Sequence, residues 1–72
     1  MEKIIEVALG ENEYLDLCDI LKIASLCSSG GEAKHHIADG AVKVDGAVET
    51  RKRCKIRKNQ IIEFDGQKIK LI

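Results

Sequence analysis

The sequence has 72 residues, and its 12 basic and 12 acidic side chains give a formal net charge of zero. Because a typical domain has roughly 100 to 200 residues, we expect residues 1–72 to form one small domain, and we exclude a multi-domain enzyme. Aromatic residues make up only 3% of the chain, which argues against a deep pocket walled by aromatic rings and therefore against a small-molecule substrate.

The first part of the chain predicts a short strand followed by a helix. Apolar residues flank Glu6 between Ile4 and Leu9 in the pattern of a strand, and Gly10 ends it. Beyond this point apolar residues recur every three or four positions, the period of an amphipathic helix, and we place the helix at about residues 14–26. Its apolar face would comprise Tyr14, Leu17, Cys18, Ile20, Leu21, Ala24 and Cys27.

A second helix follows a loop that is rich in Ser and Gly. Ser29, with Glu32 three residues later, forms the sequence pattern of a capping box at the start of a helix. We expect this helix to run to about Asp39, because Gly40 supplies the left-handed residue that commonly ends helices. Its inner face would carry Ala33, His36 and Ile37, and its outer face Lys34, His35 and Ala38.

An Asp-Gly dipeptide at positions 45 and 46 predicts a β-hairpin within residues 42–49. A strict two-residue turn would pair Lys43 with Val48 and so place an apolar side chain on the polar face of the hairpin. We therefore expect this hairpin to have a longer or bulged loop.

Residues 60–72 predict a second hairpin with its turn at Asp65-Gly66. This turn pairs Ile62 with Ile69, and the adjacent pair joins an acidic residue to a basic one, so both pairs are compatible. The predicted fold class is α+β, with two helices packed on a small, mostly antiparallel sheet that contains two β-hairpins. We expect one core formed by Ile20, Leu21, Ala33, Ile37, Val42, Val44, Ile62, Phe64 and Ile69.

The basic residues are concentrated in the second half of the chain. Residues 1–27 hold two basic and six acidic residues, whereas residues 28–72 hold ten basic and six acidic ones. Residues 51–58, which we call the basic segment, include no acidic residue and six basic ones: Arg51, Lys52, Arg53, Lys55, Arg57 and Lys58. An extended segment would present on one side Arg51, Arg53, Lys55 and Arg57, and on the other side Lys52, Lys58 and a core-facing Ile56. Such a run fits either phosphate binding or a solvated loop.

The region from the second helix to the first hairpin resembles a known RNA-binding domain. Its pattern is Ser29-x-x-Glu32-Ala33-Lys34-x-x-Ile37-x-x-Gly40-x-Val42-x-Val44-Asp45-Gly46. This pattern is similar to the domain first described in ribosomal small-subunit protein four, and residues 42–56 look like those of the stand-alone bacterial members called YbcJ-like. The resemblance extends from about Tyr14 to the end of the chain. It implies an alpha-L motif, in which the second helix and the following hairpin form an L-shaped element that cradles structured RNA, such as ribosomal or transfer RNA.

The resemblance, taken together with the charge of the basic segment, indicates which residues contact RNA. They are Ser29, Gly30, Gly31, Lys34, His35, Lys43, Arg51, Lys52, Arg53, Lys55, Arg57 and Lys58. Many members of the family carry basic residues directly after the capping serine, where this chain has two glycines. Backbone N–H groups at the start of a helix can still meet a phosphate, but we expect the basic segment to supply most of the attraction.

The other reactive side chains predict no catalytic site and no metal site. His35 and His36 diverge by about 100 degrees on a helix, so they cannot bind one ion together, and we expect no metal and no cofactor. No serine has a visible base and orienting acid, so we expect that the protein is not an enzyme. An alternative to RNA binding is a protein–protein interaction module that uses the charged faces.

Three cysteines, Cys18, Cys27 and Cys54, form neither a disulfide framework nor a C-x-x-C motif. The basic neighbours of Cys54 predict a lowered pKa for its thiol. Acidic residues stand near the N-terminus, where a signal peptide would be basic, and no apolar stretch approaches about 18 residues. We therefore expect a cytoplasmic monomer that does not enter the membrane.

Overall fold

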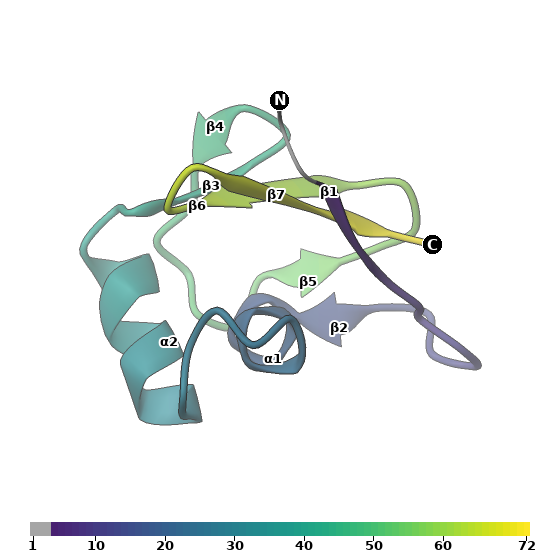
Figure 1. The fold of residues 1–72 in the computed structure, drawn as a ribbon, viewed down its shortest axis with the longest axis horizontal. Coiled ribbons are helices and arrows are strands. Elements are labelled where there is room, and N and C mark those ends of the chain that lie inside the picture. The colour runs from purple at the N-terminus through teal and green to yellow at the C-terminus, as the bar shows by residue number, and fades with distance from the viewer. Residues whose placement is uncertain (1–3) are drawn as a thin grey trace.

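The computed structural model describes residues 4–72 and shows two layers (Figure 1). A five-stranded sheet with the strand order β1-β7-β6-β3-β4 forms one layer. Both helices and a two-stranded sheet of β2 and β5 lie on the same side of it. The elements are β1 (Ile4–Val7), β2 (Leu15–Asp16), α1 (Leu17–Ile23), α2 (Gly30–Ala38), β3 (Val42–Val44), β4 (Ala47–Val48), β5 (Lys55–Ile56), β6 (Ile61–Phe64) and β7 (Gln67–Leu71). The predicted α+β class is confirmed.

Strands β6 and β7 form the second predicted hairpin at the centre of the main sheet. Ile62 pairs with Ile69, as the turn position requires, so the predicted register is confirmed. Asp65 and Gly66 have positive φ values of 52° and 74°, the conformation of a two-residue turn that follows the twist of the strands. Strand β1 adds to the outer side of β7 in parallel, which the sequence pattern did not predict.

The first hairpin, formed by β3 and β4, has a strict two-residue turn in which Lys43 pairs with Val48. The expected longer or bulged loop is therefore wrong. The side chain of Val48 is 57% exposed, because β4 is an edge strand with no layer packed over that face. It still has a neighbour, since a Cβ atom at Gly40 would lie 3.5 Å from Cγ1 of Val48. The edge strand β4 thus accommodates Val48 on the polar face of the hairpin, although the alternation of apolar and polar residues argued against this pairing.

Helix α1 is shorter than the predicted helix at residues 14–26. Residues 15 and 16 are instead extended and pair with β5, with Leu15 opposite Ile56. The first amides of the helix are bound by carbonyls of the basic segment: Leu17 N donates to Cys54 O (3.0 Å), and Cys18 N donates to Lys52 O (3.2 Å). These contacts from a distant part of the chain prevent an earlier helix start, and the positive φ of Ser25 (62°) follows its end.

Helix α2 begins and ends almost where the sequence predicts. The Ser29 hydroxyl accepts a hydrogen bond from Glu32 N (3.2 Å), which is one half of a capping box. The Glu32 carboxylate does not complete the box and instead accepts from the hydroxyl of Ser28 (2.9 Å). Gly40 has a φ of 77° and lies two residues beyond the last helical residue, as expected of a helix-ending glycine.

The core lies between the main sheet and the helical layer. Every residue of the predicted core is buried except Val44, which is partly buried and packs against the rest. The core also includes residues that the prediction did not name as its members: Val7, Leu9, Leu17, Cys18, Cys27, Ile56 and Leu71. Within residues 4–72, neither helix is long and apolar enough to cross a membrane.

Candidate nucleic-acid interface

The basic segment is not one extended stretch of chain. Residues 52 and 53 form a turn closed by a hydrogen bond from Cys54 N to Arg51 O (3.1 Å), and only Lys55–Ile56 is extended, as β5. The predicted alternation of these side chains along one extended segment is therefore wrong. Its physical cause is the pair of α1 amides that bind the carbonyls of residues 52 and 54. Ile56 is fully buried, as predicted, and fixes the segment to the core.

All six basic side chains of the segment are exposed. Three of them line a shallow hollow of about 410 Å³ together with Cys54; they are Arg51, Arg53 and Lys55. Within residues 4–72, Arg51 is the one member of the six whose cation pairs with a carboxylate within 4.0 Å. Two of the three lining cations, Arg53 and Lys55, have no carboxylate partner among residues 4–72. The hollow is therefore suited to phosphate oxygens, which need fixed positive charges and hydrogen-bond donors.

Arg51 is held by Glu49, which precedes it by two residues. Its Nε donates to Oε2 of Glu49 (3.0 Å), one terminal nitrogen donates to Oε1 (3.1 Å), and its backbone N donates to Oε2 (3.0 Å). The side-chain and backbone hydrogen bonds from Arg51 lower the pKa of Glu49 to about 2. Sequence reasoning counted Arg51 as a free cation, whereas its charge is compensated at neutral pH.

The Cys54 thiol lies between these charges but is not activated by them. Burial raises its pKa, and the hydrogen bond and charge of Glu49 raise it further against the opposing effect of Arg51. The predicted lowering of its pKa by basic neighbours is therefore wrong. Burial is the largest cause, and the acidic residue that adds to it lies five positions away, outside the immediate neighbours of Cys54 in the chain.

Tyr14 joins this surface, although the sequence reading placed it inside a helix. The Nζ atom of Lys55 lies 4.8 Å from the centre of its ring, and Cζ of Arg57 lies 5.8 Å from it. Both distances are in the range of cation–π attraction, and the ring is 37% exposed. Asp16 is a residue type that often precedes a helix, and its position was a signal for a helix start at Leu17 that would have left Tyr14 outside.

Acidic side chains adjoin the basic segment at the same tyrosine. Tyr14 lines a second hollow, of about 450 Å³, with residues of the β1–β2 loop and α1, among them Glu11, Glu13, Asp16 and Asp19. Across the two-stranded sheet, Asp16 is the partner of Lys55. The acidic first part of the chain therefore borders the basic segment at Tyr14.

The predicted contact residues on α2 form a separate group. Lys34 and His35 are exposed, and Nε2 of His35 lies 3.3 Å from the carboxylate of Asp39. At the helix start, the hydroxyl of Ser29 is occupied by the capping bond, and a Cβ atom at Gly30 would meet no atom within 4 Å. The space around this glycine is open, and its contact with RNA stays a prediction.

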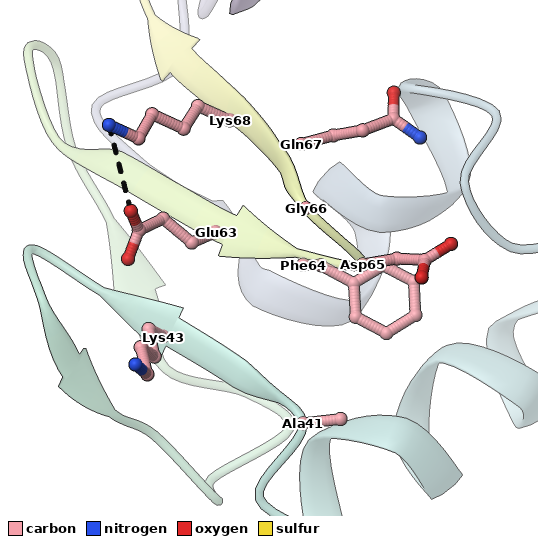
Figure 2. A pocket seen from close by; sticks show the side chains of 8 residues that line it. All are labelled: Ala41, Lys43, Glu63, Phe64, Asp65, Gly66, Gln67 and Lys68. Carbon is pink, nitrogen blue, oxygen red and sulfur yellow. Dashed lines mark ion pairs between the residues drawn. The ribbon is translucent and has the colours of Figure 1, made fainter. Parts of the chain in front are cut away.

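Lys43 completes the predicted set on the outer face of the main sheet. It lines a shallow pocket of about 280 Å³, which Figure 2 shows together with Glu63 of β6 and Lys68 of β7. Glu63 pairs with Lys68 at 3.8 Å and stands opposite Lys43 in the β3–β6 register. The predicted residues thus fall into three places: α2 and its start, the outer face of the main sheet at Lys43, and the basic segment beside α1.

Known proteins of one family are similar to this chain over most of its length. The model of the S4 domain family matches residues 7–72. YbcJ of Escherichia coli (strain K12) is 49% identical over 65 residues, which cover 90% of this chain and 93% of the relative, and the protein YbcJ of Shigella flexneri gives the same values. The resemblance stated from the sequence is therefore confirmed.

Two solved structures share the fold. The solution structure of YbcJ from E. coli, described as revealing an alpha-L motif involved in RNA-binding, superposes with a TM-score of 0.76 at 46% identity and covers 100% of this chain and 91% of that one. The 30S ribosomal protein S4e from Thermoplasma acidophilum superposes with a TM-score of 0.67 at 27% identity, covering 81% of this chain and 31% of that one.

Proposed function

The chain belongs to the S4 domain family, and from this premise we propose that it binds structured RNA through its basic face and catalyses no reaction. The basic segment is the observation that carries the proposal. Its five unpaired cations are exposed: Arg53 and Lys55 line the hollow, and Lys55 and Arg57 lie beside Tyr14. Its backbone is fixed by α1 and by a buried isoleucine. Fixed cations of this kind attract a phosphate backbone without requiring a base sequence.

Recognition of folded RNA needs few aromatic side chains. Double-helical RNA is read mainly by its shape, its phosphates and its 2′-hydroxyl groups, whereas single strands are usually read by stacking on several aromatic rings. This chain has two aromatic residues other than histidine, and Phe64 is buried in the core. The proposed ligand is therefore a folded RNA, such as ribosomal or transfer RNA, rather than an unstructured strand.

The proposed setting is the cytoplasm, with the protein acting as a monomer. Its three cysteines are free thiols, with Cys18 and Cys27 buried, and this state is typical of a reducing compartment. The relative whose structure includes an alpha-L motif involved in RNA-binding comes from a bacterium, where folded RNA is cytoplasmic. The structural similarity to the 30S ribosomal protein S4e supports ribosomal RNA as the ligand.

Binding measured against salt concentration tests the proposal. If about four to six phosphates are neutralised, log K should fall with log salt at a slope of roughly −3 to −5, from about 0.7 to 0.9 per phosphate. A structured RNA should bind more tightly than duplex DNA of the same length at one fixed ionic strength. Equal affinity for the two would contradict recognition of RNA and leave only general binding to polyanions.

A further inference from the structure

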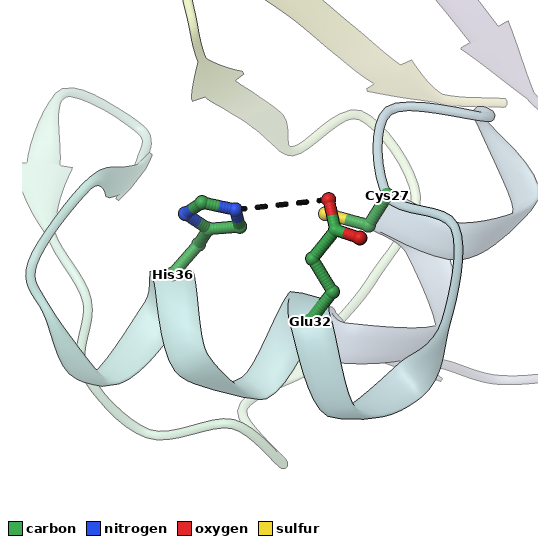
Figure 3. A group of neighbouring side chains, drawn as sticks. All are labelled: Cys27, Glu32 and His36. Atoms are coloured by element: carbon green, nitrogen blue, oxygen red, sulfur yellow. Dashed lines mark ion pairs between the residues drawn. The ribbon is translucent and has the colours of Figure 1, made fainter.

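A thiol, a carboxylate and an imidazole converge between α2 and the loop that follows α1 (Figure 3). The side chains belong to Cys27, Glu32 and His36, and one ligand atom of each lies within 4.8 Å of the other two. Nε2 of His36 is 3.8 Å from Oε1 of Glu32. These are three different donor types, S, O and N, gathered around one point.

The fold orients each of the three side chains. Glu32 and His36 are one turn apart on α2, so they share a helix face. The loop holds Cys27 in place through a hydrogen bond from its backbone N to Leu21 O (3.3 Å). Ser28 donates its hydroxyl to Oε2 of Glu32 (2.9 Å), which leaves Oε1 directed towards the imidazole. The ring of His36 is supported by the ring of Phe64, with 5.0 Å between their centres.

We propose that Cys27, Glu32 and His36 bind a divalent cation of the zinc type, with the fourth position open. Zinc accepts thiolate, imidazole and carboxylate donors, and sites with three protein ligands keep one place for water or an external ligand. Magnesium and calcium prefer oxygen donors, so the thiol selects against them.

The distances suit tetrahedral coordination. With bonds of about 2.0 to 2.3 Å, tetrahedral donors lie about 3.3 to 3.8 Å apart, and the imidazole and carboxylate are already 3.8 Å apart. The widest separation allowed by the cluster, 4.8 Å, closes by small rotations of Glu32 and His36, whose side chains are 43% and 36% exposed. Cys27 is only 5% exposed and provides the fixed donor.

An open hollow gives the cation a path to the site. Glu32 and His36 line a hollow of about 520 Å³ together with Phe64 at the end of β6 and Asp65 of the β6–β7 turn. The fourth position would face this hollow. Without a cation the thiol is held protonated, because burial and the charge of Glu32 both raise the pKa of Cys27, so the cation must displace a proton from the sulfur.

The two histidines that predicted no metal site are a different pair of side chains from those in this cluster. They are His35 and His36, which do diverge, and His35 lies beside Asp39 instead. The donors that accompany His36 come from one helical turn earlier and from across the interhelical loop. Only the path of that loop brings a cysteine nine positions away to the same point.

Zinc titration of the reduced, tag-free protein tests the site. Competition with a chromophoric chelator should give one ion per chain, and cobalt in place of zinc should show the sulfur-to-metal charge-transfer band of a thiolate ligand. Removal of a ligand by Glu32→Gln, His36→Gln or Cys27→Ser should weaken zinc binding at least tenfold. His35→Gln and Cys54→Ser remove the same side-chain types outside the cluster and should leave the affinity unchanged.

The His36→Gln variant decides the proposal, because His36 is partly exposed and circular dichroism can show that this variant folds even if Cys27→Ser does not. Unchanged zinc affinity in folded His36→Gln would overturn the proposed site, as would loss of affinity in His35→Gln. Failure of the native protein to compete with the chelator, or a cobalt spectrum without a thiolate band, would also overturn it. None of these measurements includes RNA, so their outcome is independent of the proposed function.

Discussion

Helix α2 and the basic segment both belong to the proposed RNA-binding surface, but they contribute different things. Helix α2 is a regular frame whose inner face is fully buried at Ala33 and Ile37. Its outer face has little net charge, because Lys34 and His35 are accompanied by the carboxylates of Glu32 and Asp39. Helix α2 therefore offers a ligand a rigid surface with a weak electrostatic potential.

The basic segment has the opposite character. It carries six basic residues in a turn, a two-residue strand and the two positions after that strand, and Glu49 compensates only one of them. Its fixed points are the buried Ile56 and two carbonyls bound by α1. The difference suggests a division of roles, in which the basic segment supplies most of the attraction to phosphates and α2 with its hairpin supplies the shape.

The largest expected effect comes from removing the packing that makes α2 a fixed frame. Ile37→Ala should lower the free energy of unfolding by about 2 to 5 kcal/mol, because it deletes a fully buried side chain and leaves a cavity. Urea unfolding followed by circular dichroism measures this change.

Ile23→Ala is the matched control, since that isoleucine is 55% exposed on α1 and should change stability by no more than about 0.5 kcal/mol. If Ile37→Ala were as mild as Ile23→Ala, the inner face of α2 would not be packed as described.

The second effect separates the two regions directly. Replacing Arg51, Arg53 and Lys55 together by Ala should weaken RNA binding at least tenfold, or about 1.4 kcal/mol, because these residues line the basic hollow. Replacing Lys34 and His35 together should weaken it less, because this face has less net charge. Fluorescence anisotropy with a labelled structured RNA, at one ionic strength, compares the two.

Both multiple variants should remain folded by circular dichroism, since exposed charges contribute little to stability. The reverse order of effects, with binding lost in the α2 variant and kept in the triple variant, would place the RNA along α2.

Local signals were sufficient to predict the second hairpin, the start and end of α2 and most of the core. The Asp65-Gly66 turn fixes the register of β6 and β7, because a two-residue loop leaves one way to pair the strands. The capping of α2 by Ser29 is likewise a contact between residues three positions apart. Such features depend on short stretches of chain, so the sequence pattern contains them.

The features that the sequence did not reveal depend on contacts between distant segments. Helix α1 begins at Leu17 because carbonyls more than 30 positions later bind its first amides. The same contacts bend the basic segment, and they leave Tyr14 exposed beside Lys55. Periodicity along the chain cannot report which distant group satisfies a backbone amide.

Tyr14 offers a smaller test of how the basic segment is organised. Tyr14→Ala should weaken RNA binding about two- to fivefold, because exposed cation–π contacts are worth about 0.5 to 1 kcal/mol and this ring helps to position Lys55 and Arg57. The same anisotropy assay measures the change. Tyr14→Phe keeps the ring face and should bind nearly as tightly as the native protein. A loss in Tyr14→Phe equal to that in Tyr14→Ala would assign the effect to the hydroxyl group instead of the ring.

The smallest effect on binding and stability is expected at Glu49. Its ion pair with Arg51 makes this arginine different from the other five cations of the basic segment, which have no carboxylate partner among the described residues. The pKa of Glu49 is lowered from 4.5 to about 2 by the hydrogen bonds from Arg51, so the unfolded chain binds this proton more readily than the folded one. The stabilising contribution of the carboxylate is therefore fully present above about pH 4.5 and is lost as the pH falls through about 2. Carbon chemical shifts of the Glu49 side chain, followed by NMR, report the midpoint.

Arg51→Gln should move this midpoint back towards 4.5, whereas Arg53→Gln, which removes a neighbouring cation with no bond to Glu49, should leave it low. Stability at neutral pH should barely change in either variant, because the pair is at the surface and screened by solvent. A native midpoint near 4.5 would mean that Arg51 is released in solution. All six cations of the basic segment would then be available to phosphate, and the contrast with α2 would be larger than the structure shows.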